Sequence, residues 1–152
     1  MATKRHGYGT SILYDADGVA PFTAITDSTK IKIPKMSRAK SDSTHLESPN
    51  MAKEYLSGAN AGWIDTDDCV FEAYFTDTQF NTLLSFLVAG TEYFWRVNLP
   101  LISGQTNNPY VAMKGYVNSV EFIEIDKDSD DPIKVNFTVQ RTTGLLTFTP
   151  GS

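Results

Sequence analysis

The sequence is poor in the residues that carry most enzyme and metal chemistry. It has one cysteine, Cys69, and two histidines, His6 and His45. A single cysteine excludes an intrachain disulfide framework and a paired-cysteine metal site, and it fits a reducing cytoplasm. Cys69 has no base near it in the sequence, so we expect a buried, inert thiol. The serines near His45 share its extended segment, so we interpret His45 as a surface or interface residue, and we expect no catalytic residue, cofactor or metal ion.

Long hydrophobic runs are also missing. Apolar clusters such as residues 71–75 have the length of a strand, and none approaches the roughly 18 residues of a membrane helix. Residues 1–9 are polar and basic, so no signal peptide is expected. We therefore predict no membrane contact.

Charge is present but unevenly placed. The 152 residues carry 13 Lys and Arg against 18 Asp and Glu, a net charge of -5. Residues 1–40 hold seven basic and three acidic residues, whereas residues 41–152 hold six basic and fifteen acidic ones. Such a split indicates a partner or a self-complementary contact. The acidic balance makes sequence-specific nucleic-acid binding a poor interpretation.

Asp126, Asp128 and Asp130 repeat at the spacing that begins a calcium loop. Asp131 stands where such a loop needs glycine, so we favour a solvated hairpin turn.

One helix is predicted among many strands. Thr76 and Gln79 form a capping-box pattern, and Gly90 supplies a C-terminal stop, so we expect a helix at about 77–89. Its apolar face consists of Phe80, Leu83, Leu84, Leu87 and Val88.

Alternation of polar and apolar residues predicts the strands, with a bulge at Gly115 and a polar edge strand at 37–46. Residues 47–62 are predicted to form a long loop, which is usually functional or disordered. The fold class is therefore mainly β: one domain over residues 1–152, an antiparallel β-sandwich or barrel with one flanking α-helix, with flexible ends at 1–9 and 149–152. The expected strands are 10–14, 22–25, 30–33, 37–46, 63–75, 92–99, 110–125, 133–142 and 145–148.

Several loose motifs, in order, resemble one protein family. They are Ile-Pro-Lys-Met-Ser-Arg at 33–38, Asp-Ser-Thr-His at 42–45, Lys-Glu-Tyr-Leu-Ser-Gly at 53–58, Phe-Glu-Ala-Tyr-Phe at 71–75, Trp95-Arg96, Gly-Tyr-Val at 115–117 and Thr143-Gly144. Over residues 10–148 the chain resembles the major tail tube protein of long, non-contractile-tailed bacteriophages.

The resemblance implies a structural virion protein that is not an enzyme. Six copies would form a ring, and rings would stack into a tail tube that conducts DNA into the host without sequence-specific binding. The implied partners are other copies, the tape-measure protein and the tail terminator and tip proteins. Assembly would take place in the host bacterial cytoplasm.

The resemblance also suggests site residues. Contacts between subunits or rings are expected at Arg38, Asp42, Thr44, His45, Lys53, Glu54, Tyr55 and Leu56. Candidates for acids that face the lumen are Asp65, Asp67, Glu121 and Glu124.

Two other interpretations stay open. One is another ring-forming tube protein, such as the type VI secretion tube protein or a minor tail protein at a tube end. The other is a glycan-binding β-sandwich module that uses Trp63, Trp95 and the tyrosines. For these aromatic residues we prefer core and interface packing.

Overall fold

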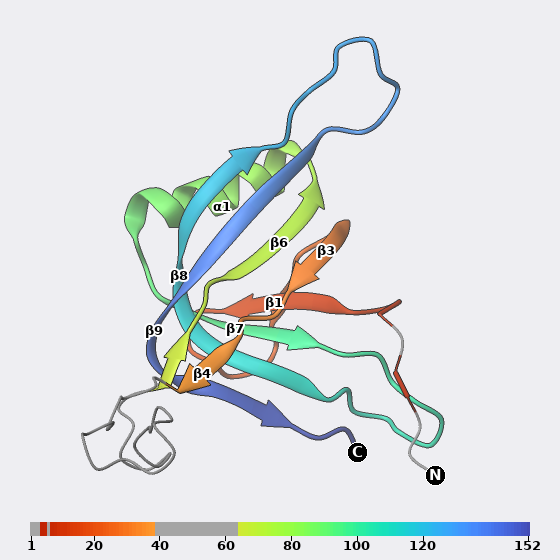
Figure 1. Ribbon diagram of the computed structural model, residues 1–152, viewed down its shortest axis with the longest axis vertical. Helices are drawn as coiled ribbons and strands as arrows, with labels where there is room; N and C mark the ends of the chain where they lie inside the picture. Colours follow the sequence, from red (N-terminus) through yellow and green to blue (C-terminus); the bar gives the residue numbers. More distant parts are fainter. Residues whose placement is uncertain (1–3, 6, 39–63) are drawn as a thin grey trace, which may run out of the picture.

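A computed structural model of the chain describes residues 4–5, 7–38 and 64–152. It contains one large antiparallel sheet, a short two-stranded ribbon and one helix, as Figure 1 shows. The elements in chain order are β1 (Ser11–Asp15), β2 (Thr23–Ala24), β3 (Ser28–Lys32), β4 (Met36–Arg38), β5 (Ile64–Thr66), β6 (Cys69–Tyr74), α1 (Asp77–Ala89), β7 (Tyr93–Asn98), β8 (Tyr110–Phe122) and β9 (Lys134–Thr149).

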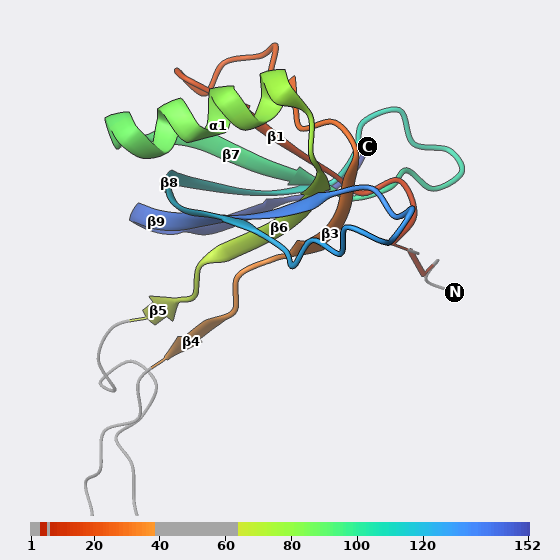
Figure 2. The same ribbon diagram turned by 90° about the horizontal axis from the view of Figure 1, so that it is seen from above.

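The large sheet has the strand order β2-β1-β7-β8-β9-β6-β3, with every pair antiparallel. The sheet is strongly bent, and β3 comes back into contact with β1 (Figure 1). Figure 2 shows α1 lying on one face of the sheet. The predicted mainly β fold with one flanking helix is therefore confirmed.

The core lies on the face of the sheet that α1 covers. Alternate residues of the central strands point into it, as period-2 patterning requires. Phe71 and Phe137 face each other in register across β6 and β9, with their rings stacked at 5.2 Å between centroids. Trp95 is 1% exposed and lies 6.1 Å from the Phe71 ring. Burying such aromatic side chains supplies a large share of the stability of a small domain.

The ends of α1 lie where the sequence predicts them. Gly90 adopts the left-handed conformation (φ 65°) and donates its N–H to the carbonyl of Phe86 at 2.9 Å, which ends the helix. Thr76 is the N-cap, but its side chain makes no capping hydrogen bond. The predicted capping box is wrong, because the Gln79 carboxamide is engaged by Thr26 instead.

The apolar face of α1 also differs from the prediction. Leu83 is completely buried, and Phe86 packs edge-on against Tyr14 at 5.3 Å. Leu84 and Val88 turn outward, with 37% and 82% of their surface exposed. The aromatic rings of β1 and β7 draw position 86 into the core, which rotates positions 84 and 88 towards solvent.

Two strand predictions need correction. The strand expected at 63–75 is broken into β5 and β6 at Asp67 and Asp68, where the Asp67 N–H donates to the Lys35 carbonyl at 3.0 Å. The strands expected at 133–142 and 145–148 are one continuous strand, β9, so the Thr-Gly pair at 143–144 makes no turn. Register shifts in β8 between Ala112 and Gly115 absorb the bend, so pairing continues along β9.

Candidate assembly surfaces

Most of the predicted contact residues fall outside the described part of the chain. These are Asp42, Thr44, His45, Lys53, Glu54, Tyr55 and Leu56. Arg38 is described: it is exposed and ends β4, where its backbone pairs with that of Ile64 in β5. The β4–β5 ribbon projects away from the large sheet (Figure 2).

The four acids predicted to face a lumen lie on the surface in two separate groups. Asp65 lies in β5 and Asp67 follows it, on the projecting ribbon. Glu121 lies at the far end of β8, and Glu124 lies in the connection to β9. The structure therefore does not bring these acids into one cluster, and their orientation in an assembly stays a prediction.

Near Glu121, the sheet carries a paired acid. Glu72 is only 9% exposed, and its carboxylate accepts a hydrogen bond from the Thr29 hydroxyl at 2.9 Å. The Lys134 ammonium lies 3.6 Å from the same carboxylate oxygen. A largely buried acid is tolerated there because charge and hydrogen bonds compensate its lost hydration.

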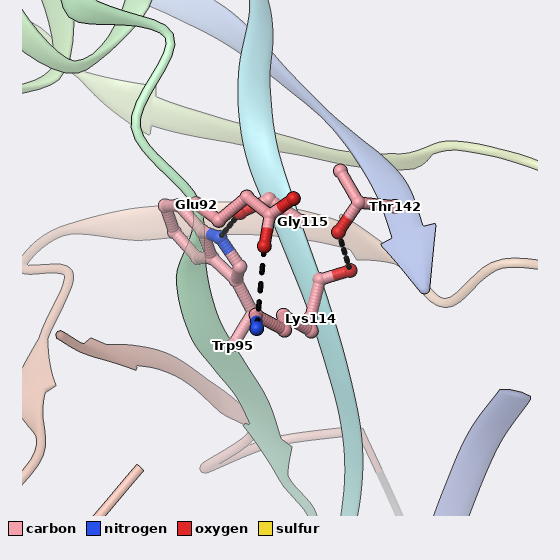
Figure 3. Close-up of polar contacts among 5 residues, drawn as sticks. All are labelled: Glu92, Trp95, Lys114, Gly115 and Thr142. Atoms are coloured by element: carbon pink, nitrogen blue, oxygen red, sulfur yellow. Dashed lines mark hydrogen bonds and ion pairs between the residues drawn. The ribbon is translucent and has the colours of Figure 1, made fainter. Parts of the chain in front are cut away.

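The predicted bulge at Gly115 is present and sits beside the core. Figure 3 shows its surroundings: the Trp95 indole N–H donates to the Gly115 carbonyl at 3.2 Å, and the Thr142 hydroxyl donates to the Lys114 carbonyl at 3.3 Å. A Cβ at position 115 would overlap the Gln140 carbonyl oxygen. Only glycine fits this close approach of two backbones.

A small hollow of about 370 Å³ lies where β7, β8 and the end of β9 run side by side. The Arg96 guanidinium is held in it between two aromatic rings, 4.1 Å from the centroid of Phe22 and 3.9 Å from that of Tyr110. The Arg96 Nε is buried and has no hydrogen-bond partner among the described residues. Lys114 also lines the hollow, but its ammonium pairs with Glu92 at 3.3 Å. The two rings therefore hold the Arg96 guanidinium in place, and it keeps hydrogen-bond donors that have no partner among the described residues; we call this residue the clamped Arg96.

The connection between β8 and β9 is an acidic hairpin loop, which we define as residues 123–133. It stands out from the body of the molecule in Figure 1. Ile125 and Ile133 are 56% and 41% exposed on it. Asp126, Asp128 and Asp130 lie there in an exposed turn, and no group of three metal-ligating side chains occurs among the described residues. The acidic residues of the loop are Glu124, Asp126, Asp128, Asp130 and Asp131, against one basic residue, Lys127.

The second half of β9 pairs with β8 alone among the described strands. On its other side β6 pairs with residues of β9 from Lys134 to Val139, and β5 contacts β9 without joining its sheet. Phe148, near the end of β9, is 60% exposed. The end of β9 near Phe148 therefore offers a place where a strand of another chain can add to the sheet.

The remaining chemical candidate is Cys69. It is 1% exposed, and burial raises the pKa of its thiol to about 12, with Asp68 adding to the shift. The predicted burial of this thiol is confirmed, and its lack of reactivity stays a prediction. The described helix is neither long nor apolar enough to span a membrane.

Comparisons with known proteins give matches at the level of structure only. No family model and no curated protein sequence matches this chain. A chain in a structure of the six-fold symmetrised baseplate of the anti-feeding prophage matches with a TM-score of 0.75 at 10% identity, over 99% of this chain and 98% of that one. A chain in the tail of an empty GTA particle, refined helically with C6 symmetry, matches with a TM-score of 0.66 at 18% identity, over 96% and 99%.

A third match is to the tail tube of SPP1, with a TM-score of 0.68 at 9% identity, over 97% of this chain and 81% of that chain. The chain therefore has the fold found in tail and baseplate particles. More particularly, it has the tail tube fold that its sequence motifs predict.

Proposed function

We propose that this chain is a structural subunit of a bacteriophage tail tube, not an enzyme. The observation that carries the proposal is the fold match over nearly the full length of both chains to structures with six-fold symmetry. A match that covers at least 96% of this chain and at least 98% of each of those chains supports a shared mode of assembly more strongly than a shared sheet would.

Six copies would close into a ring, because heterologous contacts between identical subunits close when the rotation allows it. The end of β9 near Phe148 supports such a contact, because β8 is its one partner there among the described strands and a strand of the next copy can add to the other side. The β4–β5 ribbon, which carries Arg38 at its end, projects from the large sheet (Figure 2), and we expect it to contact a neighbouring copy.

The tube would conduct DNA during ejection into the host without sequence-specific binding. The net charge of -5 supports this role, because a lumen that repels phosphates lets the genome slide. Asp65, Asp67, Glu121 and Glu124 lie on the surface and are therefore free to contribute to such a lining.

The other proposed partners follow from a tail tube. They are the tape-measure protein inside the tube and the terminator and tip proteins at its ends. Assembly would occur in the host bacterial cytoplasm, where a single free thiol such as Cys69 stays reduced.

The test is electron microscopy of the purified chain, with sedimentation at increasing concentration. We expect rings and long tubes of uniform diameter. A chain that stays monomeric at high concentration, or that is retained by immobilised glycans instead, would refute the proposal.

A further inference from the structure

We propose that the clamped Arg96 is a socket for an acidic side chain of the hairpin loop 123–133 of a second copy of this chain. The contact would be head to tail, between subunits of successive rings. It rests on the proposed tube function, and it names a specific contact that holds one ring to the next.

The first step is the state of Arg96. Two aromatic rings hold its guanidinium at 4.1 and 3.9 Å, so its position is fixed before any ligand arrives. No ion pair joins it to a described carboxylate, and its Nε is buried without a hydrogen-bond partner among the described residues. The Nη groups of Arg96 are not among the buried unsatisfied atoms, so a carboxylate that enters the hollow can accept hydrogen bonds from them. A planar guanidinium binds a carboxylate in a two-point geometry.

The second step is the chemistry of the walls. Phe22, Phe94 and Tyr110 line the hollow, and Lys114 lies on its rim with its ammonium 5.3 Å from the centroid of the Phe94 ring. The hollow therefore combines apolar walls with positive charge. A ligand that fits it carries a carboxylate together with an apolar group.

The third step is the occupant. The hairpin loop has five acidic side chains against one lysine, and it exposes Ile125 as well. The loop therefore carries both groups that fit the hollow, a carboxylate and an apolar side chain. Charge complementarity of this kind steers association and fixes the register of a contact.

The fourth step is geometry. The hollow lies at the Tyr110 end of β8, and the hairpin loop follows Phe122 at the other end of the same strand. In Figure 1 the loop is at the top of the long axis, and the Tyr110 end of β8 lies in the lower half. A loop cannot reach the socket of its own chain across that separation, but copies stacked head to tail would bring them together.

DNA is the competing occupant, because an arginine between aromatic rings can also hold a phosphate or a base. We favour the hairpin loop, since Arg96 is the one cation of the hollow without an ion pair among the described residues, and the chain as a whole is acidic. Nucleic-acid sites instead track a phosphate backbone with several cations.

The test exchanges charges between socket and loop. Arg96→Glu alone, and Asp128→Lys with Asp130→Lys alone, should each raise the subunit concentration needed for tubes at least about tenfold, because like charges then meet. Rings should still form. The chain carrying all three substitutions should recover tubes, since the carboxylate introduced at position 96 of one copy then meets the introduced ammonium groups of the next.

Lys32→Glu, an exposed change in β3 away from the hollow, is the matched control and should assemble normally. Circular dichroism checks folding, and the loop variant keeps the test decisive even if Arg96→Glu does not fold. The proposal is overturned if folded single variants form tubes as the unmodified chain does, if the triple variant does not recover tubes, or if rings are lost with the tubes. Arg96-dependent binding of a duplex oligonucleotide would also overturn it. Failure of the unmodified chain to form any ring would instead refute the tube function itself.

Discussion

The two halves of the long β8–β9 pair differ in what they bury. In the half next to the hairpin loop, β9 lies between β8 and β6, and Phe137 of β9 is 2% exposed. In the far half, beyond Val139, β9 has a described partner strand on one side only, and Phe148 is 60% exposed. One strand therefore serves the core at one end and offers a surface at the other. Stability should depend on the near half, and assembly on the far half.

The difference between the two halves is tested most strongly by removing one aromatic side chain from each. Phe137→Ala should lower the free energy of unfolding by about 3–5 kcal/mol, because it leaves a cavity against Phe71. Phe148→Ala should lower it by less than about 1 kcal/mol, since the ring is mostly in water, and should weaken tube formation. Urea unfolding and microscopy of both variants measure this. Equal losses of stability would show that the two halves are not distinct.

The junction of the halves is the bulge at Gly115. Gly115→Ala should cost about 3 kcal/mol, because the added Cβ would meet the Gln140 carbonyl oxygen and force the strands apart. Gly7→Ala is the matched control, since a Cβ at position 7 meets nothing within 4 Å. Thermal unfolding of the two variants gives the difference, and a stable Gly115→Ala chain would mean that the close approach is not required.

The reactivity of the Cys69 thiol measures whether the half of the sheet next to the hairpin loop stays packed around it. Its folded pKa of about 12 lies above that of an unfolded thiol, so its contribution to stability is full below about pH 8.5 and is lost as the pH rises towards 12. At pH 8 a thiol reagent should modify the folded chain about a hundredfold or more slowly than the urea-unfolded chain. Rapid modification of folded protein would contradict the tight packing around β6.

The smallest expected effect concerns the attachment of α1. Gln79→Ala removes hydrogen bonds to Thr26 at 2.9 and 3.1 Å and should cost about 1 kcal/mol, since the site is exposed. Asn81→Ala, on the exposed side of the same helix, should change stability by less than about 0.5 kcal/mol. Chemical denaturation distinguishes the two, and equal values would mean that the tie to Thr26 contributes nothing.

The sequence predicted the elements well where a single periodicity operates. Helix α1 begins and ends at the predicted residues, and a strand lies where alternation over residues 92–99 predicts one. The predictions failed where distant residues decide. Thr26 takes the side chain of Gln79 away from the capping box, and Tyr14 draws Phe86 inward at the expense of Leu84.

The candidate site was less accessible to prediction. Nothing in the neighbourhood of Arg96 in the sequence indicates that Phe22 and Tyr110 would enclose it. The three residues meet only when the sheet brings the residue before β2, the middle of β7 and the start of β8 together. Arg96 follows Trp95 in a strand, so the two side chains point to opposite faces of the sheet, which places Arg96 away from the core that holds Trp95. The acidic loop was visible as a charge cluster, but its position at the opposite end of β8 required the register of the sheet.

The most direct measurement is a helical reconstruction of tubes grown from the purified chain. We predict six copies per ring, with the β9 edge beyond Val139 against a neighbouring copy and the acidic hairpin loop seated at Arg96 of the next ring. Tubes of a different symmetry, or a chain that forms no ring at any concentration, would contradict the assignment of this chain to a tail tube.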